Sequence, residues 1–157
     1  MKNRELHRQH QRITLLVKRA TSASANNLEL QAEWARYICI LCSGFLENAL
    51  KELYSDFANR KASKPLAKFV GSQLALLSNP KTDKFSRIAG AFSEVWQDEL
   101  DLFMADAGRG DAINSIMGQR HLIAHGSYNK TNITLATIKV YLDKGVEVLE
   151  FIENQIQ

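Results

Sequence analysis

One segment of the sequence, residues 28–60, restricts the fold more than any other. Its apolar side chains recur at intervals of three and four residues, which is the period of one face of an α-helix. They are Trp34, Ile38, Leu41, Phe45, Ala49, Leu53 and Phe57. Because a helix rises about 1.5 Å per residue, this segment would extend roughly 50 Å. It therefore predicts a helix that spans a whole domain and against which the remaining chain packs.

Most of the remaining sequence has the same helical period. No segment alternates with a period of two over a length that suggests a strand, and the chain contains only two prolines. Further helices are predicted over residues 3–20, 63–77, 83–106, 111–125 and 132–156. We expect Asp111 to cap the helix that follows Gly108 and Gly110, and Thr131 or Asn132 to cap the last helix. Short loops between helices favour an all-α antiparallel bundle of five to six helices.

The size and charge of the chain set further limits. Its 157 residues suffice for one domain, which we expect to cover residues 1–157. The net charge of +3 is unevenly spread, since residues 1–20 and 60–87 are basic and residues 91–106 are acidic. No apolar run reaches the roughly 18 residues that a membrane span needs, so no membrane partner is expected. The N-terminal residues are charged and no apolar run follows them, which predicts a cytoplasmic protein.

Metal binding is the first chemistry to consider. Cys39 and Cys42 form a C-x-x-C pair within an apolar helical segment, without a second pair to complete a zinc site. They read as small buried hydrophobic residues. His121 and His125 have the i, i+4 spacing of zinc proteases, but Leu122 stands where such enzymes carry their catalytic glutamate. A further pair, His7 and His10, lies on a polar helix and is expected to be solvated. We therefore predict no metal or other cofactor.

The segment that carries the most distinctive chemistry is Arg120 to His125. Arg120 continues the apolar stripe of Ile113, Ile116 and Met117, so the helical period places a guanidinium where a buried side chain is expected. A charge on a stripe that faces the core is costly unless it is paired or binds an anion. On the same helix, His121 and His125 fall together on the flank of this stripe, and Gly126 ends the helix.

Two interpretations of this segment remain open from the residues alone. An arginine can hold a phosphate, and a histidine near its ordinary pKa can move a proton, which together suffice to cleave RNA through its own 2′-hydroxyl. Alternatively, Arg120 forms a structural ion pair and His125 caps the last carbonyls of its helix. Structural ion pairs often resemble functional sites, so the residue chemistry by itself favours the second interpretation.

The sequence resembles a known family in these residues. Arg120-x4-His125, at the end of the penultimate helix of an all-α chain, is similar to the R-x4-6-H motif of HEPN domains. Ser43-Gly44-Phe45-Leu46-Glu47 in the long helix also resembles the prokaryotic RiboL-PSP branch of these domains. The order of the helices, the break at Asn79-Pro80 and the final amphipathic helix extend the resemblance over almost the whole chain.

The resemblance implies a metal-independent endoribonuclease that acts as a homodimer, often as a toxin or phage-defence effector. Arg120 would then bind the scissile phosphate. His125 would act as the base on the 2′-hydroxyl or as the acid on the leaving 5′-oxygen, in a composite site shared with the second copy. The products would carry 2′,3′-cyclic phosphate and 5′-hydroxyl ends.

The chain departs from the family pattern at several positions. His121 stands where asparagine commonly follows the motif arginine. Some family members carry a tyrosine two residues after the motif histidine, which a partner nucleotidyltransferase modifies; here Ser127 holds that position and Tyr128 follows it. Glu47 would support the site from the long helix, or act as a solvated or capping carboxylate. The expected partners are RNA, a second copy, and an antitoxin or nucleotidyltransferase. The alternative function is a non-catalytic helical dimer that binds RNA, nucleotide or a protein.

Overall fold

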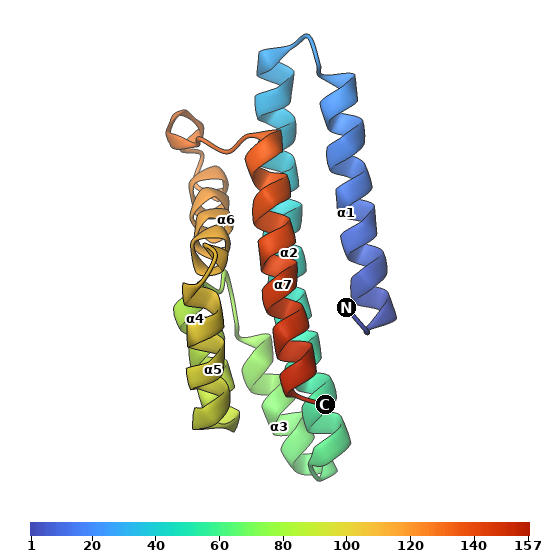
Figure 1. The fold of residues 1–157 in the computed structure, drawn as a ribbon, viewed down its shortest axis with the longest axis vertical. Coiled ribbons are helices and arrows are strands. Elements are labelled where there is room, and N and C mark those ends of the chain that lie inside the picture. Colours follow the sequence, from blue (N-terminus) through green and yellow to red (C-terminus); the bar gives the residue numbers. More distant parts are fainter.

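The computed structural model describes residues 1–157, which form α-helices joined by short loops (Figure 1). The elements are α1 (Arg4–Ala23), α2 (Leu28–Lys61), α3 (Lys64–Ala75), α4 (Thr82–Phe92), α5 (Glu94–Ala105), α6 (Arg109–Ala124), the 3-10 helix η1 (Tyr128–Lys130) and α7 (Leu135–Gln155). The predicted all-α bundle is confirmed, with seven α-helices rather than five or six. No helix combines the length and the apolar character that crossing a bilayer requires.

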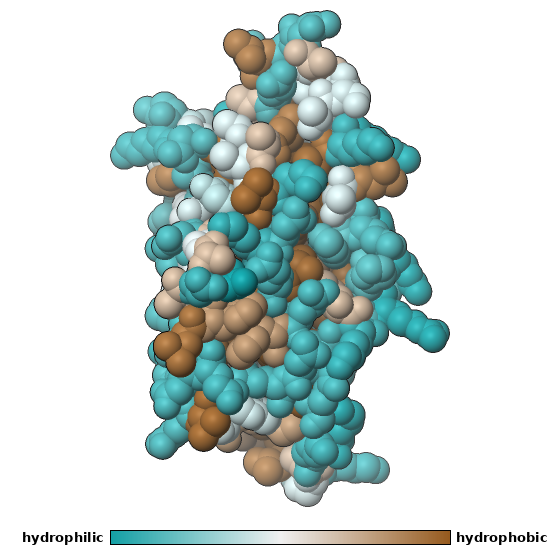
Figure 2. Space-filling model, viewed as in Figure 1, coloured by the Kyte–Doolittle hydropathy of each residue, from teal (hydrophilic) through white to brown (hydrophobic).

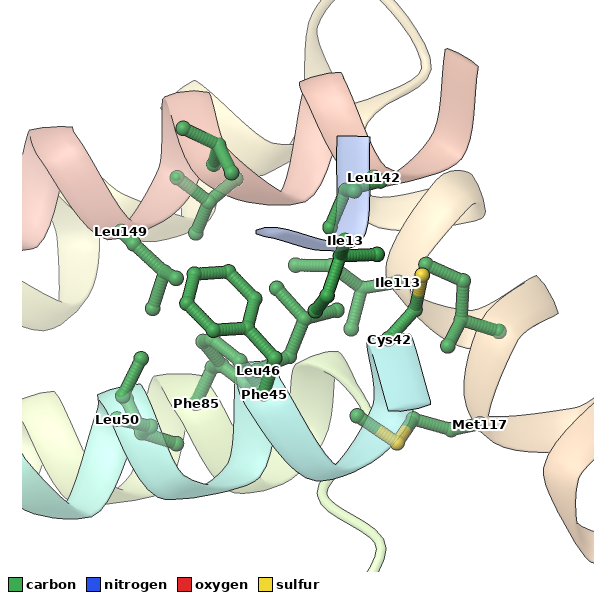
Figure 3. Packing of buried hydrophobic residues seen from close by; sticks show 14 of the residues in the cluster. Ile13, Cys42, Phe45, Leu46, Leu50, Phe85, Ile113, Met117, Leu142 and Leu149 are labelled. Carbon is green, nitrogen blue, oxygen red and sulfur yellow. The ribbon is translucent and has the colours of Figure 1, made fainter. Parts of the chain in front are cut away.

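Helix α2 is the axis of the fold, as its sequence predicts. Its 34 residues begin at the N-cap Asn27, whose side chain accepts a hydrogen bond from the backbone N–H of Leu30. The helix packs against α1, α3, α6 and α7. Its side chains meet those of α4, α6 and α7 in one continuous core of 31 buried residues, part of which Figure 3 shows. Full burial of each large aliphatic side chain contributes about 1.5–3 kcal/mol. Most of one outer face is covered by hydrophilic side chains, with separate apolar areas between them (Figure 2).

The helix predicted over residues 83–106 is in fact two helices. The backbone of Ser93 is extended, with φ −161° and ψ 128°, which ends α4 and begins α5. The Ser93 hydroxyl accepts a hydrogen bond from the backbone N–H of Trp96 at 3.4 Å, so this serine is an N-cap. The break folds α5 back against α4 (Figure 1). Phe85 and Leu100 can therefore both reach the core, where each is fully buried.

Three predicted helix boundaries also differ from the structure. Gly108, at φ +68°, is the N-cap of α6, whereas Asp111 lies in the first turn and caps nothing. The last helix is capped by Thr134, whose hydroxyl accepts a hydrogen bond from the backbone N–H of Thr137 in a capping box. Asn132 instead makes two hydrogen bonds with the side chain of Gln119 on α6. α3 ends at Ala75, two residues before the predicted end.

The cysteines and the first histidine pair occupy different environments. Cys39 and Cys42 are unpaired and fully buried, which confirms their interpretation as core residues. Burial raises the pKa of Cys39 to about 12 and also raises the pKa of Cys42. The prediction that both His7 and His10 are solvated is half wrong. His7 is exposed, but His10 is partly buried between Phe45 of α2 and Asp143 of α7.

The partial burial of His10 predicts a pH dependence of stability. Burial lowers the pKa of His10, and the opposing charges of Asp143 and Glu150 do not fully offset this effect. His7 and the N-terminal amine lower the pKa of His10 further. Because the folded state favours the neutral ring, its contribution to stability is present above the ordinary pKa of about 6.5 and is lost as the pH falls through the lowered value. The free energy of unfolding should therefore decrease from pH 7 to pH 5.

Urea unfolding of the wild type and of His10→Gln between pH 5 and pH 8 measures this effect. The glutamine variant lacks the titrating ring, so its stability should depend less steeply on pH in the acidic half of this range. Carboxylates also titrate in this range, but they do so in both proteins. The effect of His10 is therefore the difference between the two curves of unfolding free energy against pH. Parallel curves would contradict a lowered His10 pKa.

Candidate active site

The end of α6 has a well-defined geometry. The helix ends at Ala124, His125 is its C-cap, and Gly126 adopts the left-handed conformation at φ +70°. The backbone N–H of Gly126 donates to the carbonyl of Ile123 at 3.1 Å, and that of Ser127 donates to the carbonyl of Leu122 at 2.9 Å. This pair of bonds is a Schellman motif, which favours glycine at the left-handed position. As predicted, Gly126 stops the helix, and it leaves the His125 side chain exposed.

Arg120 is less buried than its sequence pattern predicts. Ile113, Ile116 and Met117 are fully buried, which confirms the apolar stripe. The buried part of α6 ends at Met117, however, and every residue from Gly118 to Ala124 is at least partly exposed. The prediction that Arg120 carries a charge into the core is therefore wrong, because this end of α6 extends past the packed layer. The apolar stripe is already covered within the chain, so it needs no second copy to bury it.

Neither motif residue has a structural partner in this chain. The Arg120 guanidinium forms no ion pair within 4 Å, since the ion pairs of the chain involve other residues. No side-chain hydrogen bond is formed by Arg120 or by His125. The backbone N–H of His125 donates a hydrogen bond to the carbonyl of His121 at 3.1 Å. Arg120 therefore forms no direct ion pair and the His125 side chain caps no carbonyl, although the charge of Arg120 is close enough to Glu47 to lower the pKa of that carboxyl.

His121 and His125 lie side by side, as their spacing predicts. Their ring centroids are 4.4 Å apart and the rings are inclined at 57°. Both residues are exposed. The chain contains no group of three or more His, Cys, Asp or Glu side chains arranged to hold a metal ion. The arrangement is therefore a pair of accessible imidazoles at the end of the helix that also carries Arg120.

Glu47 connects α2 to α6 through the loop before α4. One of its carboxylate oxygens accepts a hydrogen bond from Lys51 at 2.8 Å, and the other accepts one from the backbone N–H of Asn79 at 2.8 Å. The Asn79 amide donates in turn to the carbonyl of Met117 at 3.2 Å. Burial would raise the pKa of Glu47, but these hydrogen bonds and the charges of Lys51 and Arg120 lower it overall. Glu47 therefore binds the loop between α3 and α4, and through Asn79 this loop is hydrogen-bonded to α6 one turn before Arg120.

Tyr128 lies in η1 and faces α2 rather than the motif. The guanidinium carbon of Arg36 lies 5.5 Å from the centre of its ring, within the range of a cation–π contact. These two side chains line a pocket of about 470 Å³ together with Glu33, Tyr37, Ile40 and Ile123. The three α2 residues Glu33, Arg36 and Tyr37 could not be predicted as part of the site, because their spacing is that of any amphipathic helix. Only the fold brings them to the end of α6.

Arg120 and His125 do not converge within one chain. The helix remains regular through Ala124, so five residues at about 100° each place the two side chains about 140° apart around its axis. No hydrogen bond joins them. The unwinding that would bring them together in a single chain is absent, since the left-handed turn begins only at Gly126.

Comparison with known proteins identifies the family of the chain. A family model described as RiboL-PSP-HEPN matches residues 5–157. No curated protein and no solved structure gives a significant match.

Proposed function

This chain belongs to the RiboL-PSP-HEPN family, and from that premise we propose that it is a metal-independent endoribonuclease. The observation that carries the proposal is that Arg120, which forms no ion pair, and the exposed His125 both lie at the end of α6. A guanidinium that binds phosphate and an imidazole that moves a proton can together suffice for cleavage of RNA through its 2′-hydroxyl. Neither group is engaged in holding the chain together, so both are free for a ligand.

The chemistry we propose needs no group beyond the protein and the RNA. One His125 accepts the proton of the 2′-hydroxyl, and the 2′-oxygen attacks the adjacent phosphorus. The bond from phosphorus to the 5′-oxygen breaks, and a second imidazole donates a proton to this leaving oxygen. Arg120 stabilises the negative charge of the pentavalent phosphorus. The products carry a 2′,3′-cyclic phosphate and a 5′-hydroxyl, and no water is consumed.

The separation of Arg120 from His125 within one chain favours a site built from two copies. In a twofold dimer, each motif helix presents its two faces to a shared cleft, so an arginine and a histidine from different copies can meet. The leaving-group acid is then the His125 of the second copy. His121 supports the site as the imidazole beside His125, and Glu47 supports it by fixing the register of α6.

We propose that the second copy binds at a groove between α1 and α2. Its apolar lining includes Leu15, Leu16, Leu41 and Phe45, and Gly44 lies on the same exposed face of α2. A Cβ atom added at Gly44 would meet no atom within 4 Å, so the surface there is open to a close approach. The groove shares Tyr37 and Ile40 with the pocket beside Ile123 and therefore leads to the end of α6.

In this role the protein would act as a toxin or phage-defence effector and would need a partner to restrain it. An antitoxin or a nucleotidyltransferase is the partner we propose. Modification of Tyr128 fits less well, because Tyr128 stands one position beyond the expected tyrosine and its ring faces Arg36. The second function, binding of RNA or nucleotide without cleavage, is favoured by the pocket between α2 and the end of α6.

Cleavage of a mixed-sequence RNA in the presence of EDTA tests the proposal. The wild-type protein should cleave equally well with and without EDTA, because no step uses a metal ion. The fragments should resist phosphatase until acid opens their cyclic phosphate ends. Loss of cleavage on chelation would indicate a metal site at the histidine pairs. A folded dimer that binds the RNA but leaves it intact would favour the binding function.

A further inference from the structure

We propose that the pocket lined by Tyr37 and Tyr128 binds one unpaired nucleobase of the RNA, stacked against the tyrosine rings. Its place beside the scissile bond rests on the proposed function, but the binding itself does not. The pocket of about 470 Å³ lies between α2 and the loop that follows α6 (upper left in Figure 1). This volume is within the range of about 300–1,000 Å³ that is usual for sites of small ligands.

The two tyrosines are exposed although their neighbours hold them in place. Tyr37 is 53% exposed and Tyr128 is 55% exposed, which leaves ring surface free for a ligand. Trp34 packs edge-on against Tyr37, with ring centroids 5.9 Å apart and an angle of 70° between the planes. The guanidinium of Arg36 lies over the Tyr128 ring, with its central carbon 5.5 Å from the ring centre. Proteins bind the bases of single-stranded RNA by stacking them on aromatic rings that are held in place in this manner.

The pocket adjoins the proposed site along the chain. Ile123 and Tyr128, which line it, lie two residues before and three residues after His125. Three residues span at most about 11 Å even when fully extended. A base held in the pocket would therefore place its own nucleotide, or the next one, beside the His125 imidazole.

The charges in the pocket suggest which base it prefers. Neither Glu33 nor Arg36 forms an ion pair, so the Glu33 carboxylate is free to accept hydrogen bonds. Guanine presents two neighbouring N–H donors on its Watson–Crick edge, which match the two oxygens of a carboxylate. Arg36 supplies a positive charge for an adjacent phosphate. We infer that guanine is the preferred base.

A short RNA that cannot be cleaved tests the inference independently of catalysis. The probe is a tetranucleotide with 2′-O-methyl groups and one 2-aminopurine, whose fluorescence is quenched on stacking. Wild-type protein should quench it, and Tyr37→Ala or Tyr128→Ala should each weaken binding by roughly 5- to 150-fold. Tyr37→Phe should retain binding. The matched control is Phe69→Ala, since Phe69 on α3 is similarly exposed but lies outside the pocket and should have no effect.

Competition with otherwise identical tetranucleotides that carry G, A, C or U tests the choice of base. Guanine should compete best, and Glu33→Gln should reduce its advantage at least about fivefold, because an amide offers only one acceptor oxygen. Quenching of this probe by a protein that leaves the mixed-sequence RNA intact would support the pocket while contradicting the nuclease. Cleavage with unchanged binding in both tyrosine variants would overturn the pocket and leave the nuclease standing. Tyr37 also lines the α1–α2 groove, whereas Tyr128 does not, so Tyr128→Ala is the decisive variant. Unchanged binding in Tyr128→Ala, or equal losses for Phe69→Ala, would also overturn the pocket.

Discussion

Replacement of His125 by alanine should reduce the rate of RNA cleavage by about 10²- to 10⁴-fold, the usual contribution of a general acid or base. The loss should be at the upper end of this range if both copies lend a histidine to one site, because the base and the acid then disappear together. The fold should be unaffected. The His125 side chain is exposed and makes no hydrogen bond, so its removal should change the free energy of unfolding by less than about 0.5 kcal/mol.

Arg120→Ala should lower the cleavage rate by about 10²- to 10³-fold through loss of charge stabilisation. Arg120→Lys should recover part of this loss, since lysine keeps the charge but not the planar pair of donors. His7→Ala is the matched control, because His7 is an exposed histidine far along the chain from the motif. Initial rates and thermal unfolding should be measured on the same preparations. Unfolding of either motif variant would instead assign that residue a structural role.

The second large effect is expected at Gly44. Gly44→Glu should abolish the dimer and, with it, RNA cleavage. The folded chain can accept the new side chain, because a Cβ atom at Gly44 meets no neighbour and glutamate favours a helix by about 0.5–1 kcal/mol over glycine. At the twofold interface, however, the side chain would occupy space that the second copy needs, and its carboxylate would lose water in a groove where only Arg12 and Arg19 could pair with it. Overpacking and the loss of hydration together should cost about 3 kcal/mol, which is more than 100-fold in the dissociation constant of the dimer.

Gly71→Glu provides the control for this variant. Gly71 also lies within a helix, α3, and a Cβ atom there also meets nothing within 4 Å. The change of residue and charge is identical, but Gly71 lies outside the α1–α2 groove. Sedimentation at micromolar concentration should show a monomer for Gly44→Glu and a dimer for Gly71→Glu. A dimer that survives in Gly44→Glu with full activity would show that the second copy binds elsewhere.

The parts of the fold that the sequence predicts are those with a long, uninterrupted pattern. The apolar period of residues 28–60 is unambiguous and predicts α2 to within one residue at its end. Residues 83–106 have the same period, but a single serine at position 93 divides them. The spacing of apolar residues does not show whether a serine between them continues one helix or ends it and caps the next helix. That choice depends on whether Phe85 and Leu100 reach the same core, which is a property of the tertiary structure.

The candidate site could be predicted only as far as it is local. Arg120, His121, His125 and Gly126 are close in sequence, so helical geometry predicts the adjacent imidazoles and the end of the helix. The prediction that Arg120 is buried is wrong. The periodicity of α6 does not show that the helices packed against it cover it only as far as Met117. Contacts between distant segments carry no local pattern. The link from Glu47 through Asn79 to α6 and the pocket around Tyr37 are of this kind.

A mixture of two inactive variants tests the composite site most directly. Arg120→Ala and His125→Ala would be purified, mixed, allowed to exchange subunits, and assayed on RNA in EDTA beside the wild type. If each site takes its arginine from one copy and its histidine base from the other, one site of every mixed dimer contains both Arg120 and one His125 and lacks only the second His125, the acid. Random exchange should then raise the rate above that of either variant alone, to at most about a quarter of the wild-type rate, with 2′,3′-cyclic phosphate ends. Active wild type with no recovery in mixtures shown to contain mixed dimers would contradict the composite site.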